Sequence, residues 1–187
     1  NLYITRSGYT GEDGFEISIS NENAENFINK VFKNENTLLC GLGCRDSLRV
    51  EAGLSLYGNE INEDITPIQA NLSWAIDKKR LDDENLNGSN ILLQQLQETK
   101  DTVKIGITPV NKTMLRNNMT LHNMEKNEIG YITSGCFSPI LKRSIGIGYI
   151  NNFTNKLDKL FVKVRGEFEE VIIDNIPFVK KNYKKGG

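Results

Sequence analysis

Three glycines, three carboxylates and two aromatic rings are concentrated in the ten residues from Gly8 to Ile17. Glycine permits the sharp turn that such a segment needs and lets a ligand approach the backbone closely. A carboxylate held beside that turn suits a flat ligand with several N–H groups, because its two oxygens only accept hydrogen bonds. The stretch therefore indicates a binding site, although an ordinary tight hairpin with solvated acidic side chains explains the same residues.

The segments on either side of this turn are typical of β-strands. Residues 2–5 and 15–19 are rich in β-branched and aromatic side chains. Along the second segment apolar and polar residues alternate, so Glu16 lies on the face opposite Ile17. If the apolar row faces a core, Glu16 is the carboxylate that a stiff strand presents beside the turn.

The composition bounds the class of protein. A chain of 187 residues with 38% apolar and 25% charged residues can form one large or two small globular domains. No apolar run approaches the roughly 18 residues that a membrane span needs, so no membrane segment is expected. Because residue 1 is Asn and a strand begins at once, we expect this chain to be part of a longer protein.

Charge is distributed unevenly along the chain. Residues 1–100 carry 16 acidic and 9 basic residues, whereas residues 101–187 carry 8 and 14. This asymmetry favours attraction between the two halves or a basic face for an anionic partner, and a solvated surface without a partner explains it too. The basic residues are scattered and few aromatics lie among them, so nucleic-acid binding is not expected.

Cysteine and histidine are too sparse for a metal site or a His-based catalytic pair. The cysteines are Cys40, Cys44 and Cys136, and His122 is the only histidine. An odd number of cysteines cannot form a complete disulfide framework, and no second Cys/His pair accompanies Cys40 and Cys44. We therefore expect no metal, a reducing compartment and buried thiols.

Apolar spacing predicts helices at 21–34, with Ser20 as N-cap, and at 45–54. Arg45 at a helix start opposes the helix dipole by up to about 1 kcal/mol. That position is easier to explain if Arg45 serves a ligand anion or a buried carboxylate, the alternative being an exposed arginine without a function.

Residues 37–40 are expected as a strand or buried turn. Alternation predicts a strand at 72–76, whose Trp74 is either core or a flat wall beside a ligand.

From residue 103 onward, short apolar runs recur every 8 to 12 residues or so, which is typical of a small all-β barrel or sandwich. We expect an α+β chain: an α/β part at 1–85, a linker helix at 86–100 and a β-barrel domain at 101–187. The predicted strands are 103–107, 119–121, 129–133, 145–150, 160–164 and 171–173.

Many of these segments, in this order, closely resemble the aminomethyltransferases (T-proteins) of the glycine cleavage system. The resemblance covers essentially the whole chain, and shared order across two predicted domains is more specific than a single motif. The matching segments are GYTGEDGFE at 8–16, RDSLRVEAGL at 45–54, LYGN at 56–59, Thr66-Pro67, LSW at 72–74, Ile129-Gly130, TSGC at 133–136, SPIL at 138–141, Gly148-Tyr149, Val164-Arg165, PFV at 177–179 and Asn182-Tyr183.

The resemblance implies a folate enzyme built from a folate-binding α/β domain and a barrel. Such an enzyme transfers the methylene carbon from an aminomethyl group on the lipoyl arm of the carrier H-protein to tetrahydrofolate, giving 5,10-methylenetetrahydrofolate and ammonia. Tetrahydrofolate is a substrate, and no metal, nucleic acid or membrane is implied. The implied location is the mitochondrial matrix in a eukaryote and the cytoplasm in a bacterium.

Three positions carry over from the family as folate contacts, namely Glu16, Arg45 and Tyr183. Trp74 is a weaker candidate, and Lys104 stands where relatives can have Arg. A pterin edge offers paired N–H donors to one carboxylate, and the anionic glutamyl tail of folate suits arginine. We hypothesise that Glu16 and Arg45 converge on one pocket that Tyr183 closes.

The family's catalytic aspartate lies in an N-terminal part that this sequence lacks. No carboxylate here is assigned its role, and the isolated chain is expected to be inactive.

Two competing interpretations remain: the folate half of a dimethylglycine or sarcosine dehydrogenase, and a non-catalytic folate-binding module. The sequence upstream of Asn1 would decide between them. Folate-binding iron–sulfur assembly proteins are disfavoured because their Lys-Gly-Cys-Tyr motif is absent.

Overall fold

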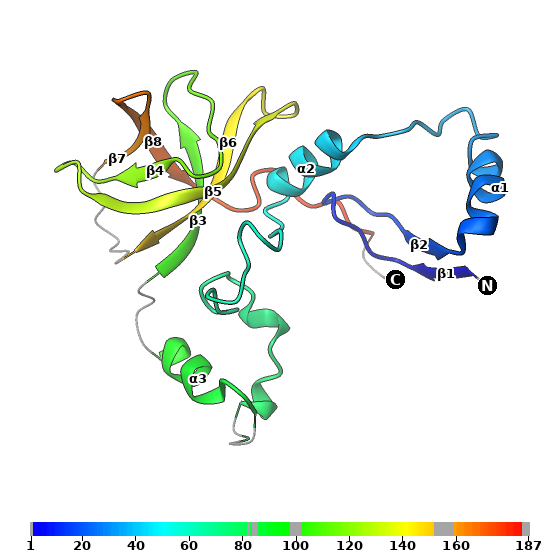
Figure 1. The fold of residues 1–187 in the computed structure, drawn as a ribbon, viewed down its shortest axis with the longest axis horizontal. Helices are drawn as coiled ribbons and strands as arrows, with labels where there is room; N and C mark the ends of the chain where they lie inside the picture. The colour runs from blue at the N-terminus through cyan, green and yellow to red at the C-terminus, as the bar shows by residue number, and fades with distance from the viewer. Residues whose placement is uncertain (1, 82, 84–85, 98–101, 152–158, 185–187) are drawn as a thin grey trace.

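Six strands in the second half of the chain close into a barrel, in agreement with the spacing of the apolar runs. The computed structural model describes residues 2–81, 83, 86–97, 102–151 and 159–184. Neighbouring barrel strands are antiparallel in the order β3-β6-β5-β4-β7-β8, and β8 pairs with β3 to close the ring (Figure 1). The strands are β3 (Thr102–Pro109), β4 (Thr120–His122), β5 (Glu128–Ser138), β6 (Arg143–Asn151), β7 (Leu160–Val164) and β8 (Glu167–Asp174).

Aliphatic side chains fill the barrel. Alternate residues of each strand point inward, which is why runs of β-branched residues with period 2 form this core. Each such side chain contributes roughly 1.5–3 kcal/mol when it is fully buried. The buried cluster consists of Ile105, Ile107, Leu115, Leu121, Ile132, Ile150, Leu160, Val162 and Val171.

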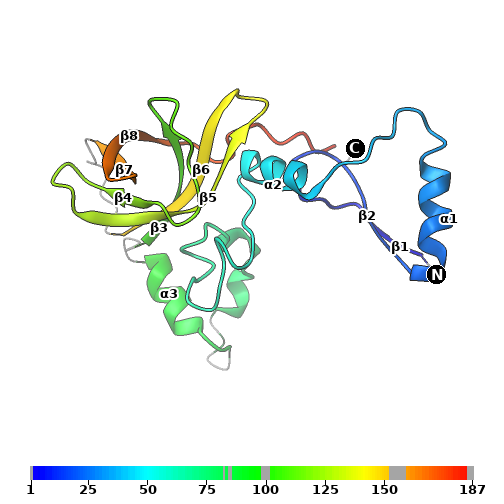
Figure 2. The ribbon, with the colours of Figure 1, turned by 45° about the horizontal axis from the view of Figure 1, so that its top comes forward.

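The first half of the chain extends away from the barrel. The predicted hairpin is confirmed, because β1 and β2 pair antiparallel with Leu2 opposite Ile19 and Thr5 opposite Glu16. Helix α2 lies between the barrel and this hairpin in both ribbon views (Figures 1 and 2). The elements are β1 (Leu2–Thr5), β2 (Glu16–Ile19), α1 (Asn21–Val31), α2 (Leu42–Glu51), the 3-10 turns η1 (Ser73–Ala75) and η2 (Lys78–Arg80), and α3 (Ser89–Gln97).

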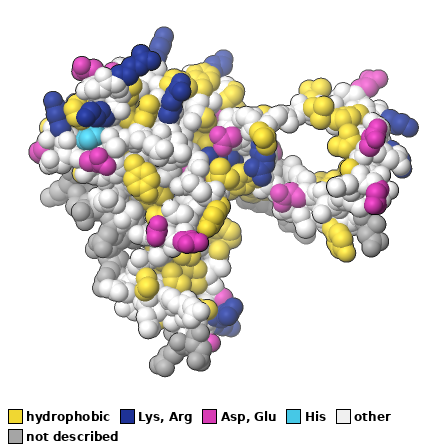
Figure 3. Space-filling view, in the orientation of Figure 1, with side chains coloured by type: hydrophobic (Ala, Val, Ile, Leu, Met, Phe, Trp, Pro, Cys, Tyr) yellow, Lys and Arg dark blue, Asp and Glu magenta, His cyan; other side chains and the backbone are white. Residues whose placement is uncertain are grey.

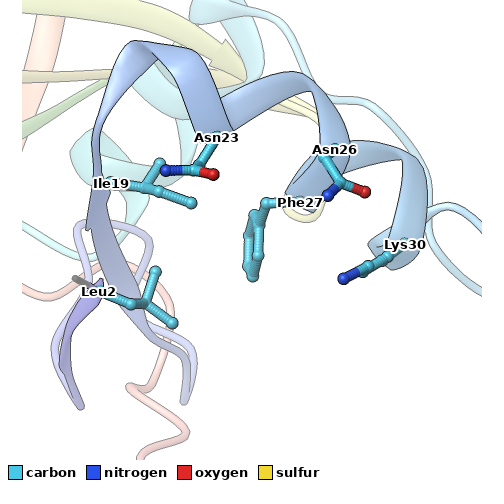
Figure 4. A pocket seen from close by; sticks show the side chains of 6 residues that line it. All are labelled: Leu2, Ile19, Asn23, Asn26, Phe27 and Lys30. Atoms are coloured by element: carbon cyan, nitrogen blue, oxygen red, sulfur yellow. The ribbon is translucent and has the colours of Figure 1, made fainter.

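Residues 2–41, here called the N-terminal arm, bury little. Helix α1 forms as predicted but has no buried residue, so the expectation that it packs on the sheet is wrong. Leu2 and Ile19 from the hairpin and Phe27 from α1 border an open pocket of about 440 Å³ (Figure 4). The apolar row of β2 is largely exposed as well, and apolar side chains are visible along the arm in Figure 3. Two strands and one helix have too little surface to enclose a core.

Three further expectations for the first half are wrong. Residues 72–76 contain the 3-10 turn η1 instead of a strand, because Asn71 adopts a left-handed φ of 58° and breaks the extended backbone. Leu38 and Leu39 are exposed, so residues 37–40 are not a buried segment. Helix α2 begins at Leu42, three residues before the predicted start at Arg45.

Helix α3 lies inside the predicted linker at 86–100. Residues 98–101, at the end of that linker, are outside the described part, and the proposed domain limits remain a prediction. None of the helices in the described part is both long enough and apolar enough to cross a bilayer.

Candidate functional site

The turn between β1 and β2 is fixed at three points. Gly11 has a left-handed φ of 80°, and a Cβ there would lie 2.7 Å from the Cβ of Ala52, so only glycine lets the turn approach the end of α2. The Arg6 guanidinium donates to both carboxylate oxygens of Asp13, at 3.1 and 2.8 Å. The Tyr9 hydroxyl donates to the carbonyl of Ser55 at 2.5 Å. The turn is therefore a positioned loop.

After the barrel is complete, residues 175–184 return to the arm, and we call them the C-terminal strap. The backbone N–H of Val179 donates to the carbonyl of Glu51 at 3.0 Å, which ties the strap to α2. Further on, the N–H of Asn182 donates to the carbonyl of Gly11 at 2.8 Å, and its side-chain amide donates to Glu12 at 3.0 Å. The strap thus brings Tyr183 to the glycine-rich turn.

A first pocket, of about 320 Å³, lies where the strap meets the turn. Glu16 stands next to it, because the hydroxyl of Ser7, one of the lining residues, donates to Glu16 Oε2 at 2.6 Å. The predicted association of Glu16 with Tyr183 therefore has a geometric basis in this pocket. It is lined by Arg6, Ser7, Gly8, Glu12, Asp13, Gly14, Tyr183 and Lys184.

Arg45 is not among the residues that line the first pocket. It lies in the first turn of α2, where its backbone N–H donates to the carbonyl of Gly41 at 3.2 Å. Its guanidinium carbon is 4.4 Å from the ring centroid of Tyr9, a cation–π arrangement. The exposed guanidinium therefore lies against the Tyr9 ring of the same turn, where its N–H groups can donate to an anion.

A second pocket, of about 190 Å³, contains the other two candidates, Trp74 and Lys104. Lys104 is only 6% exposed and its ammonium donates to the hydroxyl of Ser55 at 2.7 Å. Burial lowers the pKa of Lys104 from its ordinary value, and the neighbouring Glu60 carboxylate opposes this shift. Trp74 lines this pocket and is 81% exposed, so it is not a core residue. The strap also lines this pocket, through Ile176, Pro177 and Lys181.

A buried ion pair between α2 and the loop at Glu60 is hydrogen-bonded to the barrel. Arg49 is 1% exposed, and its guanidinium donates to Glu60, also fully buried, at 2.8 Å. The same guanidinium donates to Ser134 of β5 at 2.7 Å and to the half-exposed Asp46 at 2.8 Å. The hydroxyl of Thr133 donates to Glu60 at 2.5 Å. The sequence analysis singled out Arg45 in this helix and missed this cluster.

Glu51 makes a second buried contact with the barrel. One of its carboxylate oxygens accepts from the Ser138 hydroxyl and from the N–H of Ile140, the latter at 3.4 Å. Its other oxygen is buried without a hydrogen-bond partner among the described residues. The sequence clue to both contacts was that charged residues, Arg49 and Glu51, continue into the last turn of the helix, two residues before Gly53.

The cysteines and the histidine depart in part from expectation. Cys40 and Cys44 are exposed and only Cys136 is partly buried, so the expectation of buried thiols is wrong for the first two. His122 lies in the barrel wall with its ring nitrogens bonded to Thr120 and to the carbonyl of Lys126, at 2.8 and 3.1 Å. In the described part of the chain, no three His, Cys, Asp or Glu side chains are grouped as a metal site.

Each half of this chain matches a known protein family. Residues 1–80 match the family described as the GCVT N-terminal domain, and residues 100–180 match the glycine cleavage T-protein C-terminal barrel domain.

Curated proteins that are similar to nearly the whole length of this chain include aminomethyltransferases. The mitochondrial aminomethyltransferase of Flaveria trinervia is 41% identical over 186 residues, which are 98% of this chain and 46% of that protein. The human mitochondrial aminomethyltransferase is 39% identical over 181 residues, 96% of this chain and 45% of that protein. The chain thus spans about half the length of these curated relatives.

One solved structure has the same arrangement. The crystal structure of glycine cleavage system aminomethyltransferase T from Bartonella henselae superposes with a TM-score of 0.91 at 36% identity. The superposition covers 98% of this chain and 51% of that one. Hairpin, α2, barrel and strap are therefore shared with a solved protein.

Proposed function

The chain belongs to the glycine cleavage T-protein family, and on this premise we propose that it forms one wall of the tetrahydrofolate site of an aminomethyltransferase. The reaction moves the methylene carbon of an aminomethyl-lipoyl carrier to tetrahydrofolate. The carbon–sulfur and carbon–nitrogen bonds of the donor break, the carbon bonds to two folate nitrogens, and ammonia and the lipoyl thiol are released.

The observation that carries this proposal is the meeting of the strap with the glycine-rich turn. It brings Tyr183 to the pocket beside Glu16, although the two residues are far apart in the sequence. A carboxylate that accepts the paired N–H donors of a pterin fits this place, because Ser7 already fixes one of its oxygens. Arg45, on the outside of the same turn, supplies charge for the glutamyl tail.

Trp74 and Lys104 lie in the second pocket, so we assign them roles at the edge of the folate site and not direct contacts like that of Glu16. Lys104 already donates to Ser55 and is almost fully buried, so it positions the wall between the two pockets. Trp74 offers a large exposed aromatic face on which a heteroaromatic ring can stack. We place both residues at the edge of the folate site.

No described residue is assigned the proton-transfer role in this proposal. Glu12 and Asp13 are engaged in the turn itself, through Asn182 and Arg6. The catalytic aspartate comes from a segment outside residues 1–187, as does the opposite wall of the cleft. Normal turnover by residues 1–187 alone would contradict this division.

The donor is the lipoylated H-protein, for which the barrel offers a basic surface. Lys126, in the turn between β4 and β5, and Lys163, on β7, lie 5.1 and 5.9 Å from the ring centroid of Phe168 on β8. An acidic carrier would be attracted to them at a distance. Since the Flaveria trinervia and human relatives are named as mitochondrial, we propose the mitochondrial matrix as the location if the source is a eukaryote, and the cytoplasm if the source is a bacterium.

Tetrahydrofolate binding to the full-length gene product tests the site. Glu16→Gln and Arg45→Ala are each expected to weaken binding about tenfold to a hundredfold, since each removes a charge-assisted hydrogen bond worth about 1.5–3 kcal/mol. The matched controls are Glu22→Gln on α1 and Arg116→Ala on the barrel, which make the same chemical changes at exposed positions away from both pockets. Unchanged affinity in both site variants, measured by titration calorimetry, would overturn the proposal.

A further inference from the structure

Lys104 on β3 is a buried cation without a carboxylate partner. The residue is only 6% exposed, and its ammonium donates to the Ser55 hydroxyl at 2.7 Å. Among the described residues, no carboxylate forms an ion pair with it. A lysine ammonium has three N–H donors, of which the bond to Ser55 uses one. The others are available to a ligand.

The buried carboxylate of Glu60 does not take the place of such a partner. One of its oxygens accepts from the Arg49 guanidinium at 2.8 Å and from the N–H of Leu56 at 2.9 Å. The other oxygen accepts from the Thr133 hydroxyl. Buried charges in proteins are generally paired, because an unpaired charge is costly to remove from water. A bound anion would supply the direct partner that Lys104 lacks.

The second pocket combines this cation with another one and with apolar walls. Lys181 of the strap lines the pocket together with Lys104, and no described Asp or Glu does so. Trp74, Leu54 and Leu72 are among the other lining residues. The pocket volume of about 190 Å³ is smaller than that of sites for drug-sized ligands, which are roughly 300–1,000 Å³. Two cations beside aromatic and aliphatic side chains suit a small organic acid.

We propose that the second pocket binds a small organic carboxylate, whose oxygens accept hydrogen bonds from Lys104 and Lys181 while its apolar part lies against Trp74. The carboxylate is either one end of the tetrahydrofolate in the first pocket or a separate small acid. The site follows from the unpaired ammonium and the pocket lining, so it does not depend on folate binding at Glu16. Burial, which lowers the pKa of Lys104, also strengthens the attraction of its ammonium for an anion.

Benzoate is a suitable probe, because it joins one carboxylate to a flat apolar ring. Calorimetric titration of the full-length gene product is expected to show saturable binding of benzoate. Lys104→Met should abolish this binding, and Lys181→Met should weaken it about threefold to tenfold, because an exposed cation contributes less than a buried one.

Lys180→Met is the matched control for the strap. Lys180 is the exposed neighbour of Lys181 and does not line the second pocket, so this variant should bind benzoate like the unmodified protein. No saturable binding by the unmodified protein, or equal affinity in the unmodified protein and both site variants, would overturn the proposal.

Thermal unfolding separates ligand binding from a structural role of Lys104. Methionine keeps the unbranched chain and removes the unpaired charge, which offsets the lost bond to Ser55, so Lys104→Met should unfold at no lower temperature than the unmodified protein. Benzoate should raise the unfolding temperature of the unmodified protein and not that of Lys104→Met. A large loss of stability in Lys104→Met without benzoate would show that the protein itself compensates the ammonium, and would overturn the proposal.

Tetrahydrofolate distinguishes the two sources of the carboxylate. If the carboxylate is part of tetrahydrofolate, saturating tetrahydrofolate should displace benzoate and Lys181→Met should weaken tetrahydrofolate binding. If it is a separate acid, benzoate should bind equally with and without tetrahydrofolate. Either result supports the site. Glu16→Gln should leave the affinity for benzoate unchanged, so a failure of the proposed folate site can be told from a failure of this one.

Discussion

Arg49 is the residue through which α2 is joined to the barrel. Its guanidinium has partners on three parts of the chain, in its own helix, in the loop at Glu60 and on β5 at Ser134. A buried ion pair is not by itself strong evidence of stability, because removing two charges from water costs several kcal/mol each. Breaking one is a different matter, because the remaining charge is left buried and unpaired.

Replacing Arg49 with Met tests this role. The substitution keeps the length of the side chain but leaves the Glu60 carboxylate buried without its cation, and we expect a loss of about 3–5 kcal/mol in the free energy of unfolding. Asp46→Asn is the matched control, since its carboxylate is half exposed and its bond to the same guanidinium is worth about 0–1 kcal/mol. Urea denaturation measures both, and equal losses in the two variants would contradict the assignment.

Elements with a regular apolar period could be predicted from the sequence, and irregular ones could not. The barrel strands, the hairpin and α1 follow from local alternation or helical spacing. At 72–76 the same alternation gave a wrong strand, because the left-handed φ of Asn71 redirects the backbone and no side-chain period records it. A local sequence pattern is enough to identify a strand or a helix, whereas the path of a connecting segment depends on the residues that it contacts elsewhere in the chain.

The site illustrates the same limit. Alternation alone drew attention to Glu16, but only its family resemblance linked it to Tyr183. The burial of Arg49 and Glu60 could not be predicted, because Ser134 and Thr133, which satisfy them, come from the distant barrel. Exposure of Cys40 and Cys44 depends likewise on how little of the arm packs against anything.

The close contact between the end of α2 and the strap depends on one glycine, Gly53. Gly53 has a left-handed φ of 67°, and a Cβ there would lie 1.9 Å from Cγ2 of Ile176 in the strap. Gly58 also has a left-handed φ, of 92°, but a Cβ there would meet nothing within 4 Å. The two positions differ in crowding and share the backbone strain.

Alanine at these two glycines separates strain from crowding. Gly58→Ala is expected to cost about 1 kcal/mol, from the left-handed backbone alone. Gly53→Ala should cost about 1–3 kcal/mol more, because Ile176 must move and with it the strap. Thermal unfolding of the two variants gives the difference, and similar losses would show that the strap does not rest on Gly53.

At the scale of the whole molecule, stability is unevenly distributed. The barrel contains the continuous aliphatic core, whereas the hairpin and α1 are largely exposed and border an open pocket (Figure 3). Segments with few buried contacts open with a lower free energy than a packed core. Among the described residues, the arm therefore behaves as a more labile part than the barrel.

Hydrogen exchange followed by mass spectrometry measures this difference. In residues 1–187, amides of β3, β5 and β6 are expected to exchange only on global unfolding, and those of β1, β2 and α1 within the shortest labelling times. Exchange of the same peptides in concentrated denaturant gives the unprotected reference. Comparable protection in arm and barrel would show that the arm is held by more than its visible contacts.

Because the strap follows the barrel in the sequence, it is synthesised after all the barrel strands. The last barrel strand ends at Asp174, so a ribosome has delivered all six barrel strands before it reaches the strap. The wall that Tyr183 adds to the turn at Gly11 forms only from the final residues described. A premature stop codon between these two points would yield a nascent chain that has all six barrel strands and lacks the residues that the strap contributes to the first pocket.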